Sequence, residues 1–450
     1  MVDGGLSLQP HIQAMTPVDR QQRWVKAKVL LQSFAQADGV VLGSSDWTVA
    51  PSSAEVRAVL KKLAVPVLAA NLTCGGEAPF PGATVVERDG RRIGLVGVTE
   101  GEVDGCVVAP PGPALAEAVS SLGPVDAVVA LIPMRSEGVV AQVVGDTAVD
   151  VVVDGSGRYG ASGPKAMGSG WAIGAGTRGK HLGRAELVFL PGASGGFRPV
   201  LDPAQAEAQV ERLEKRLASV EERLERPDTD ARRRQALEMQ RTRVQAELEE
   251  ARAALVPADG AAHHQLRLSE LALSRDVADH PEALKWVEGV SEKIAQTALK
   301  QAATRVVRDA SSVYAGSDAC AGCHPAATKQ WTTTGHAHAY ATLAASGDAA
   351  DASCVPCHVT GWAGASNDFR PYAFEGAGDG PRTPADVGGL RDVQCESCHG
   401  PSRAHAEKPT EATPLGKVPE GVCQQCHDNQ RDDGQFDLET YRPKVVHGPG

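Results

Sequence analysis

The first 200 residues alternate short apolar runs with amphipathic stretches. Runs of four to eight residues that are rich in Val, Ile and Leu are typical of buried strands. These runs are residues 39–42, 65–68, 93–97, 125–132 and 149–153, and the stretches with helical periodicity are residues 20–37, 54–63 and 113–122. Strands that alternate with helices predict an α/β layered domain over residues 1–200.

The apolar spacing changes after residue 205. Two segments place apolar residues three and four positions apart, which is the spacing of one helix face, and Pro227 lies between the segments. The apolar positions are Val210, Leu213, Leu217, Val220 and Leu224, and then Val244, Leu248, Ala251 and Leu255. We predict an antiparallel coiled-coil hairpin over residues 201–260.

Residues 261–313 are expected to form connecting helices. Pro281 suits the first turn of a helix, and apolar residues continue at helical spacing to about Asp309. His263 and His264 precede this helix and are interpreted as surface or linker residues, with haem ligation as the alternative if the hairpin folds toward the haem domain.

The last segment, residues 314–450, is rich in Gly, Ala, Asp and Pro and poor in Leu, Ile and Val. Such a segment cannot bury an ordinary apolar core. It repeats one pattern, Cys-x-x-Cys-His, four times. The copies are Cys320-Ala-Gly-Cys323-His324, Cys354-Val-Pro-Cys357-His358, Cys395-Glu-Ser-Cys398-His399 and Cys423-Gln-Gln-Cys426-His427.

This pattern is the signature of covalent haem attachment. The two cysteines form thioethers with the vinyl groups of one haem, and the adjoining histidine binds the iron. Zinc ribbons and disulfide scaffolds also pair cysteines, but neither explains a histidine after every pair. We predict a mostly α-helical and irregular multihaem cytochrome c domain with four covalently bound haem c groups. The eight motif cysteines attach the haems, and His324, His358, His399 and His427 are the proximal ligands.

The sixth iron ligands are expected to be histidines. No Met follows Met239, so His/Met ligation cannot arise within this domain. The remaining histidines there are His336, His338, His405 and His447. His336 and His338 lie near the start of a predicted helix, where residues two apart point to different faces, so only one of them is expected to reach a given iron.

Several segments resemble the tetrahaem cytochrome c-554 family over roughly the last third of the chain. They are Tyr314-Ala-Gly-Ser-Asp-Ala-Cys320, Trp331-x4-His336, Cys357-His358-Val-Thr-Gly-Trp362 and Val393-Gln-Cys395-Glu-Ser-Cys398-His399-Gly-Pro401-x3-His405. The resemblance implies a periplasmic electron carrier with closely packed haems. It makes His336 and His405 distal ligands to haems held by other motifs, and His447 a candidate ligand for one of the later haems. It also implies that one haem, the one on Cys354 and Cys357, is five-coordinate.

Charge and hydropathy limit the partners and the location. The 450-residue chain has a net charge of −11, which argues against nucleic acid and anionic membranes and suits redox partner proteins with a basic docking patch. No apolar run has the length of a transmembrane helix, and the first thirty residues lack the apolar core of an export signal. Because bacterial haem c is attached in the periplasm, we expect a periplasmic protein whose native start lies upstream of Met1.

The N-terminal domain resembles the metallophosphatase domain of the 5′-nucleotidase family. The matching segments are 2–5, 38–43, 67–71, 89–98, 150–153 and 174–183, and the family's first strand would precede Met1. Family metal ligands are replaced at Leu6, Ser45, Pro133, Ser156 and Arg158, residue types that bind such metals poorly or not at all. The resemblance therefore implies a degenerate domain without phosphatase or nucleotidase activity.

Two cysteines, Cys74 and Cys106, lie outside the haem motifs. In an oxidising compartment they could pair, but the sequence leaves two free thiols equally open.

The sequence thus favours a periplasmic electron carrier with four mainly bis-histidine haems and an inactive N-terminal scaffold or docking domain. The alternative is an enzyme whose five-coordinate haem acts on a small nitrogen compound such as hydroxylamine or nitrite.

Overall fold

The computed structural model describes residues 1–5, 8, 17–134, 136–155, 164–176, 179, 181–201, 203–225, 231–254, 262–274, 276–304, 313–363, 374, 387–427 and 436–448. The chain forms two compact units. The first comprises Met1–Pro10, Leu31–Thr48 and Ser52–Ala278, and the second comprises His11–Leu30, Val49–Pro51 and Asp279–Gly450. None of the described helices is both long enough and apolar enough to cross a membrane.

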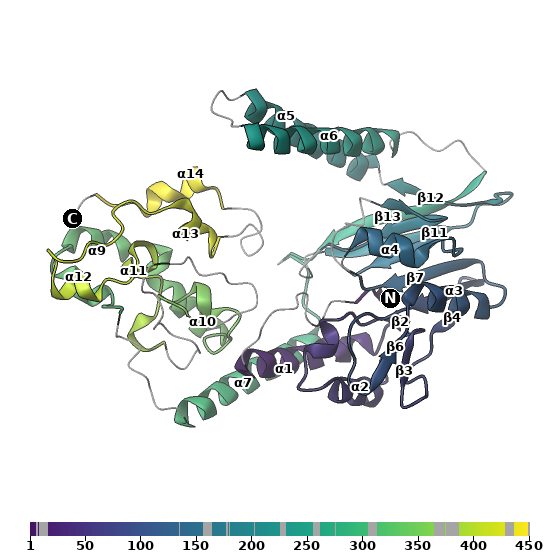
Figure 1. Ribbon diagram of the computed structural model, residues 1–450, viewed down its shortest axis with the longest axis horizontal. Helices are drawn as coiled ribbons and strands as arrows, with labels where there is room; N and C mark the ends of the chain where they lie inside the picture. Colours follow the sequence, from purple (N-terminus) through teal and green to yellow (C-terminus); the bar gives the residue numbers. More distant parts are fainter. Residues whose placement is uncertain are drawn as a thin grey trace. The chain divides into compact units, whose positions relative to one another are not determined.

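A six-stranded mixed sheet lies at the centre of the first unit (Figure 1). Its order is β4 (Ala83–Arg88), β5 (Arg91–Gly97), β7 (Ala127–Ile132), β8 (Val151–Asp154), β10 (Gly170–Ile173) and β9 (Lys165–Met167). The inner pairs are parallel, and β4 and β9 run antiparallel to their neighbours. The predicted α/β layered class is therefore confirmed.

Both faces of this sheet are buried, which explains the apolar run that predicted β7. Val128, Ala130 and Ile132 pack with residues of the helices α3 (Pro111–Ser121) and α4 (Glu137–Val144). Ala127, Val129 and Leu131 belong to the core on the opposite face. That core includes Phe197, Leu266 and Leu268 from a second sheet.

Smaller elements complete the α/β layers. They are β1 (Val2–Asp3), which pairs in parallel with β2 (Gly39–Val40), the helix α2 (Ser53–Lys62), and the antiparallel pair β3 (Leu72–Cys74) and β6 (Cys106–Val108). The predicted strand at residues 65–68 makes only a single parallel bridge, between Val67 and Val40. Cys74 and Cys106 lie directly opposite each other in β3 and β6 and form a disulfide. The pairing that the sequence left open is thereby decided.

The second sheet corrects part of the prediction for residues 261–313, because residues 263–272 form a strand, whereas the helix predicted to begin at Pro281 is present as α7 (Pro281–Thr304). Its order is β11 (His181–Val188), β13 (His263–Ala272) and β12 (Gly195–Leu201). His263 and His264 therefore begin a strand and are not linker residues. In β13, Leu266 and Leu268 point into the core while Arg267 is exposed, which is the two-residue period of a half-buried strand. The predicted boundary at residue 200 thus falls inside this unit, which ends after β13.

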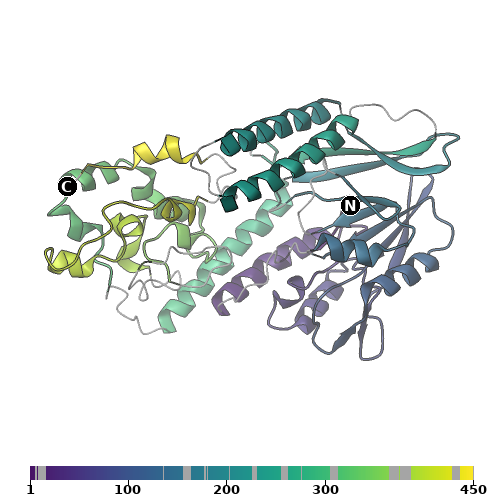
Figure 2. The ribbon, with the colours of Figure 1, turned by 45° about the horizontal axis from the view of Figure 1, so that its top comes forward.

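Two long helices form the insertion between β12 and β13. They are α5 (Pro203–Glu225) and α6 (Ala231–Ala254), which run side by side (Figure 2). Ion pairs join Arg216 to Glu247 and Arg252 to Glu214, so the residues pair in opposite chain directions. The predicted antiparallel helix pair is present, and the residues of the connecting turn lie outside the described part of the chain.

The second unit is built from short helices. After α7 (Pro281–Thr304), it contains α8 (Ser317–Ala321), α9 (Pro325–Trp331), α10 (Ala339–Ser346), α11 (Cys395–His399), α12 (Arg403–Glu407), α13 (Glu420–Gln424) and α14 (Leu438–Tyr441). One small apolar cluster among its described residues consists of Leu343, Val355, Val359, Trp362 and Val387. Helix α1 (Pro17–Phe34) belongs to this unit as far as Leu30, although it was predicted as part of the α/β domain.

Candidate haem-binding site

Each Cys-x-x-Cys-His motif folds as one helical turn. Backbone hydrogen bonds from His324 N–H to Cys320 O (2.8 Å) and from His427 N–H to Cys423 O (3.0 Å) close the first and fourth motifs. The second motif forms a 3₁₀ turn at Val355–Cys357, and the third is α11. A single turn brings residues three and four apart to one side. The two sulfur atoms and the following imidazole of each motif are thereby directed to one side, as attachment to a single haem requires.

Three imidazoles from outside the motifs face motif histidines. His405 faces His324 with 6.3 Å between ring centres, and His336 faces His427 at the same distance. His447 faces His399 with 5.6 Å between ring centres. In each pair the two histidines come from segments that are far apart in the sequence.

This spacing fits a metal held between two imidazoles. A metal–imidazole bond is about 2 Å long, and the ring centre lies roughly 1 Å behind the bonding nitrogen, so two rings on opposite sides of one metal are about 6 Å apart. The three pairs have this separation. The residues present therefore fit bis-histidine haem iron at the first, third and fourth motifs.

The imidazoles are also oriented through their second nitrogen. Nδ1–H of His399, His405 and His447 donates to the carbonyl oxygens of Leu415 (2.5 Å), Ala412 (2.8 Å) and Gly448 (2.9 Å). This contact fixes the tautomer and leaves Nε2 as the free metal-binding atom. Burial, and the nearby His427, lower the pKa of His336, which favours the neutral imidazole that binds metal.

The second motif differs from the other three. His358 donates its Nδ1–H to the carbonyl oxygen of Ala339 (2.6 Å), and Thr342 is also within reach. Within the described part of the chain, no imidazole stands opposite His358 as one does at the other motifs. His338 is exposed on the same short turn as His336. Unlike His336, it has no ring contact with a motif histidine among the described residues.

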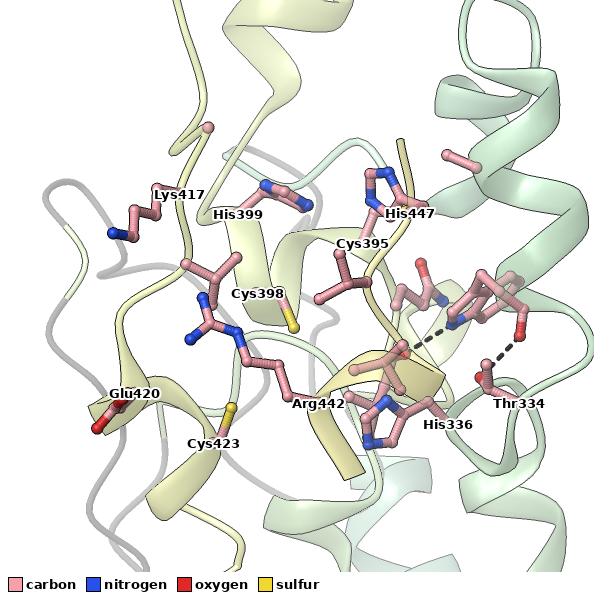
Figure 3. Close-up of a pocket in the computed structure, with 18 of the residues that line it drawn as sticks. Thr334, His336, Cys395, Cys398, His399, Lys417, Glu420, Cys423, Arg442 and His447 are labelled. Atoms are coloured by element: carbon pink, nitrogen blue, oxygen red, sulfur yellow. Dashed lines mark hydrogen bonds between the residues drawn. The ribbon is translucent and has the colours of Figure 1, made fainter. Parts of the chain in front are cut away.

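A cavity of about 320 Å³ lies between the third and fourth motifs (Figure 3). Cysteines from both motifs line it, together with His336, His399 and His447. The rest of the lining is mainly apolar and includes Ala327, Trp331, Val393, Val418, Leu438, Val445 and Val446, with Lys417 and Arg442 as its basic groups. An apolar cavity with a few basic side chains suits a porphyrin, which has an apolar ring and two carboxylates.

The first and third motifs meet directly. Helices α8 and α11, which carry Cys320 and Cys395, contact each other. The proximity of the two thiols lowers the pKa of Cys395 and raises that of Cys320. Since each sulfur would carry a thioether to a different haem, two haems would lie close together here.

Glu396 ties these two motifs together, and the sequence analysis did not identify it. The side chain lies between Cys395 and Cys398 and is 1% exposed. Its carboxylate accepts hydrogen bonds from the backbone N–H groups of Ala315 (2.9 Å), Gly316 (2.8 Å) and Ser402 (2.7 Å). The signal available in the sequence was a charged residue inside a haem motif in a segment with little apolar core.

The N-terminal positions where the resemblance implied lost metal ligands are only partly described. Leu6, Ser156 and Arg158 lie outside the described residues. Asp46, beside Ser45, is buried, and its carboxylate accepts hydrogen bonds from Gly43 N–H (2.8 Å) and Leu8 N–H (3.0 Å). Among the described residues, no group of three His, Cys, Asp or Glu side chains is arranged to hold a metal ion.

The family model described as cytochrome c554 and c-prime matches residues 319–400. The matched segment holds the first three motifs, and the fourth follows it. The resemblance of this segment to the cytochrome c-554 family is thereby confirmed, and it indicates a multihaem cytochrome. A search of curated proteins found no match.

Two solved structures from Thermus thermophilus are similar to part of the chain. Sulfate thiohydrolase SoxB in complex with glycerol matches 41% of this chain and 35% of its own, with 19% identity and a TM-score of 0.33. A 5′-nucleotidase precursor from the same organism matches 42% of each chain, with 19% identity and a TM-score of 0.33. The chain thus spans less than half the length of either structure.

Proposed function

We propose that this protein is a periplasmic electron carrier that holds four haem c groups. The observation that carries the proposal is the set of three imidazole pairs, each joining a Cys-x-x-Cys-His motif to a histidine from elsewhere in the chain. Bound haem would supply reversible one-electron chemistry at iron. Bis-histidine ligation favours electron transfer over catalysis because it leaves no position open for a substrate.

In this proposal the ligand pairs are His324 with His405, His399 with His447, and His427 with His336. For the haem on Cys354 and Cys357 we assign His358 as the proximal ligand and infer five-coordinate iron, since the described residues include no imidazole opposite His358. The other segments of the chain orient these imidazoles through the Nδ1 hydrogen bonds described above.

A buried donor near the second motif supports the presence of a haem there. The indole nitrogen of Trp362, a residue that is 4% exposed, makes no hydrogen bond within the part of the chain that the structure describes. Trp362 packs in one cluster with Val355, which lies between the two cysteines of the motif. A buried N–H without an acceptor is costly, and a haem propionate would supply the acceptor.

Electrons would pass between neighbouring haems and then to partner proteins. The contact between α8 and α11 supports close packing of the first and third haems, and the shared cavity supports close packing of the third and fourth. The acidic chain suits a partner with a basic docking surface. The α/β domain would serve as an inactive scaffold or docking module.

The alternative is an enzyme that acts on a small nitrogen compound. The observation that favours it is the lack of a described imidazole opposite His358, since an open iron position is what substrate binding requires. A shift in the high-spin ferric spectrum on adding nitrite or hydroxylamine, followed by turnover, would identify the enzyme. Ligand binding without turnover would favour the carrier.

The haem content provides the direct test. The chain with an added export signal would be produced in a periplasm that attaches haem c, and its mass would be measured after denaturation. We expect four covalent haems per chain, one on each motif peptide. Bound zinc with unmodified motif cysteines would overturn the proposal.

A further inference from the structure

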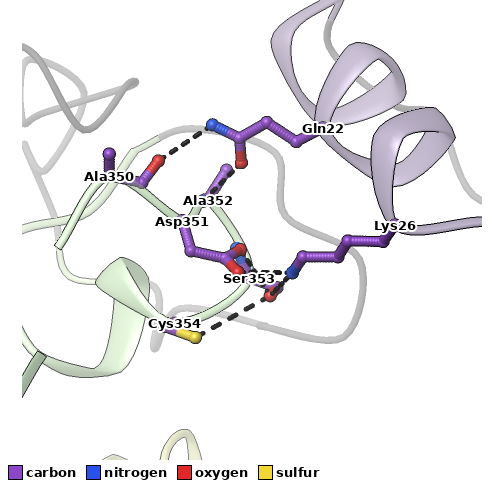
Figure 4. Close-up of polar contacts among 7 residues, drawn as sticks. All are labelled: Gln22, Lys26, Ala350, Asp351, Ala352, Ser353 and Cys354. Atoms are coloured by element: carbon purple, nitrogen blue, oxygen red, sulfur yellow. Dashed lines mark hydrogen bonds and ion pairs between the residues drawn. The ribbon is translucent and has the colours of Figure 1, made fainter. Parts of the chain in front are cut away.

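The segment that leads into the second haem motif is held by side chains of α1, over 320 residues earlier in the sequence (Figure 4). Gln22 is 3% exposed and bridges this segment in both directions. Its Nε2 donates to the carbonyl oxygen of Ala350 (2.8 Å), and its Oε1 accepts from Ala352 N–H (2.8 Å). A glutamine amide that makes both bonds fixes the backbone on either side of Asp351.

Lys26 holds the same segment by charge. Its ammonium forms an ion pair with the carboxylate of Asp351, which is 6% exposed, and donates to Ser353 Oγ (3.0 Å). Ser353 also donates to the Asp351 carboxylate through N–H (2.9 Å) and Oγ (2.7 Å). Burial opposes the ionisation of Asp351, but Lys26 and these hydrogen bonds outweigh it and lower its pKa.

The network ends at the attachment cysteine. Ser353 Oγ lies 3.9 Å from Cys354 Sγ, the atom that would carry a thioether of the second haem. Gln22 and Lys26 are four residues apart and therefore lie on one face of α1. Since this part of α1 belongs to the same compact unit as the haem motifs, the helix is structurally a component of the haem domain.

We propose that Gln22 and Lys26 are positioning residues for the second haem. Gln22 holds the attachment segment in place, and the Lys26–Asp351 pair sets the reduction potential of this haem. A positive charge near a haem stabilises the reduced state, which carries one positive charge fewer, and a negative charge has the opposite effect. The inference rests on the proposed function, because it requires a haem on Cys354 and Cys357.

Two variants that each remove one charge of the Lys26–Asp351 pair distinguish an effect on the reduction potential from a merely structural effect. Lys26→Gln leaves the Asp351 carboxylate uncompensated, so we expect the potential of the second haem to fall. Asp351→Asn leaves the Lys26 ammonium uncompensated, so we expect the potential to rise. A structural disturbance would move both variants in the same direction. Lys28→Gln is the matched control, because it removes the same charge from the same helix at a residue that lies over the Trp24 ring.

The measurement is a spectroelectrochemical titration of the full holoprotein, resolved into its haem components. We expect opposite shifts of the high-spin component in the two variants and little change in the other three components or in Lys28→Gln. Shifts of equal sign, or no shift in either variant, would overturn the assigned role of the pair.

Gln22→Leu tests positioning without a change in charge. We expect less haem on the peptide that contains Cys354 and Cys357, with the other three motif peptides fully loaded, as measured by mass spectrometry. Equal loading of all four peptides would overturn the role of Gln22. If the wild-type peptide itself carries no haem, the proposed function fails, and this outcome is distinct from failure of the inference alone.

Discussion

Removal of one distal imidazole should convert one haem from low spin to high spin without detaching it. His405 faces His324, and His336 faces His427, each across 6.3 Å. Alanine at position 405 or 336 would leave one iron with a single imidazole. The two thioethers and the motif histidine remain, so the covalent haem count should not change.

The magnitude follows from the number of imidazole pairs. Three pairs among four motifs leave one haem per reduced chain open to carbon monoxide. We expect His405→Ala and His336→Ala each to raise the stoichiometry to two per chain, and the double variant to raise it to three. His338→Ala should leave it at one, because the His338 side chain is exposed on the same turn.

The assay is a carbon monoxide titration of the reduced holoprotein, with covalent haem measured by mass on the same samples. His338→Ala is the internal control for changes in the turn itself. The ligand assignment would be refuted if His338→Ala bound two carbon monoxide molecules per chain while His336→Ala bound only one. A wild-type stoichiometry of zero would refute the five-coordinate second haem while leaving the three pairs intact.

Three further predictions test other parts of the chain. Glu396→Ala removes the acceptor of one buried and two part-buried backbone N–H groups and should lower the free energy of unfolding by about 3–5 kcal/mol. Urea denaturation at matched haem content measures this loss, and an unchanged midpoint would contradict the anchoring role of Glu396. The pKa of Asp351 is lowered in the folded protein, so its ionised carboxylate stabilises the fold fully at pH values above its ordinary pKa of 3.8. The difference in unfolding free energy between wild type and Asp351→Asn should therefore disappear as the pH falls through the lowered pKa. Incubation with manganese or zinc and AMP should release no phosphate, and metal-dependent release would show that the α/β domain keeps an active site.

The parts of the fold that the sequence predicted well depend on local patterns. The apolar runs of β5, β7 and β8 indicated strands because both faces of these strands are buried. Strand β13 was missed because its partners β11 and β12 precede the α5–α6 insertion. Its two-residue alternation is short, and nothing nearby in the sequence shows where it pairs.

The candidate site divides in the same way. The four motifs are local and predicted their own chemistry, and the histidines outside them were few enough to name as candidates. Which candidate faces which motif is set by the fold, as when His336 meets His427 rather than the motif that precedes it. Nothing in the sequence identified Gln22 and Lys26, because the sequence pattern of a helix face that binds a backbone segment and one aspartate is the same as that of a solvated helix face.

Polar anchors take the place of an apolar core in the haem domain. The domain has few large aliphatic residues, and porphyrins would fill much of its interior, so its segments must be aligned by other means. Besides Glu396, Gln394 accepts a hydrogen bond from Ser317 N–H (2.7 Å), and Thr360 accepts one from Gln394 N–H (2.9 Å). Buried polar groups of this kind stabilise only one alignment, since any other leaves them without partners. The Gln22 and Lys26 contacts follow the same rule at the second motif, where the described part of the chain places no second imidazole to hold the haem from its other side.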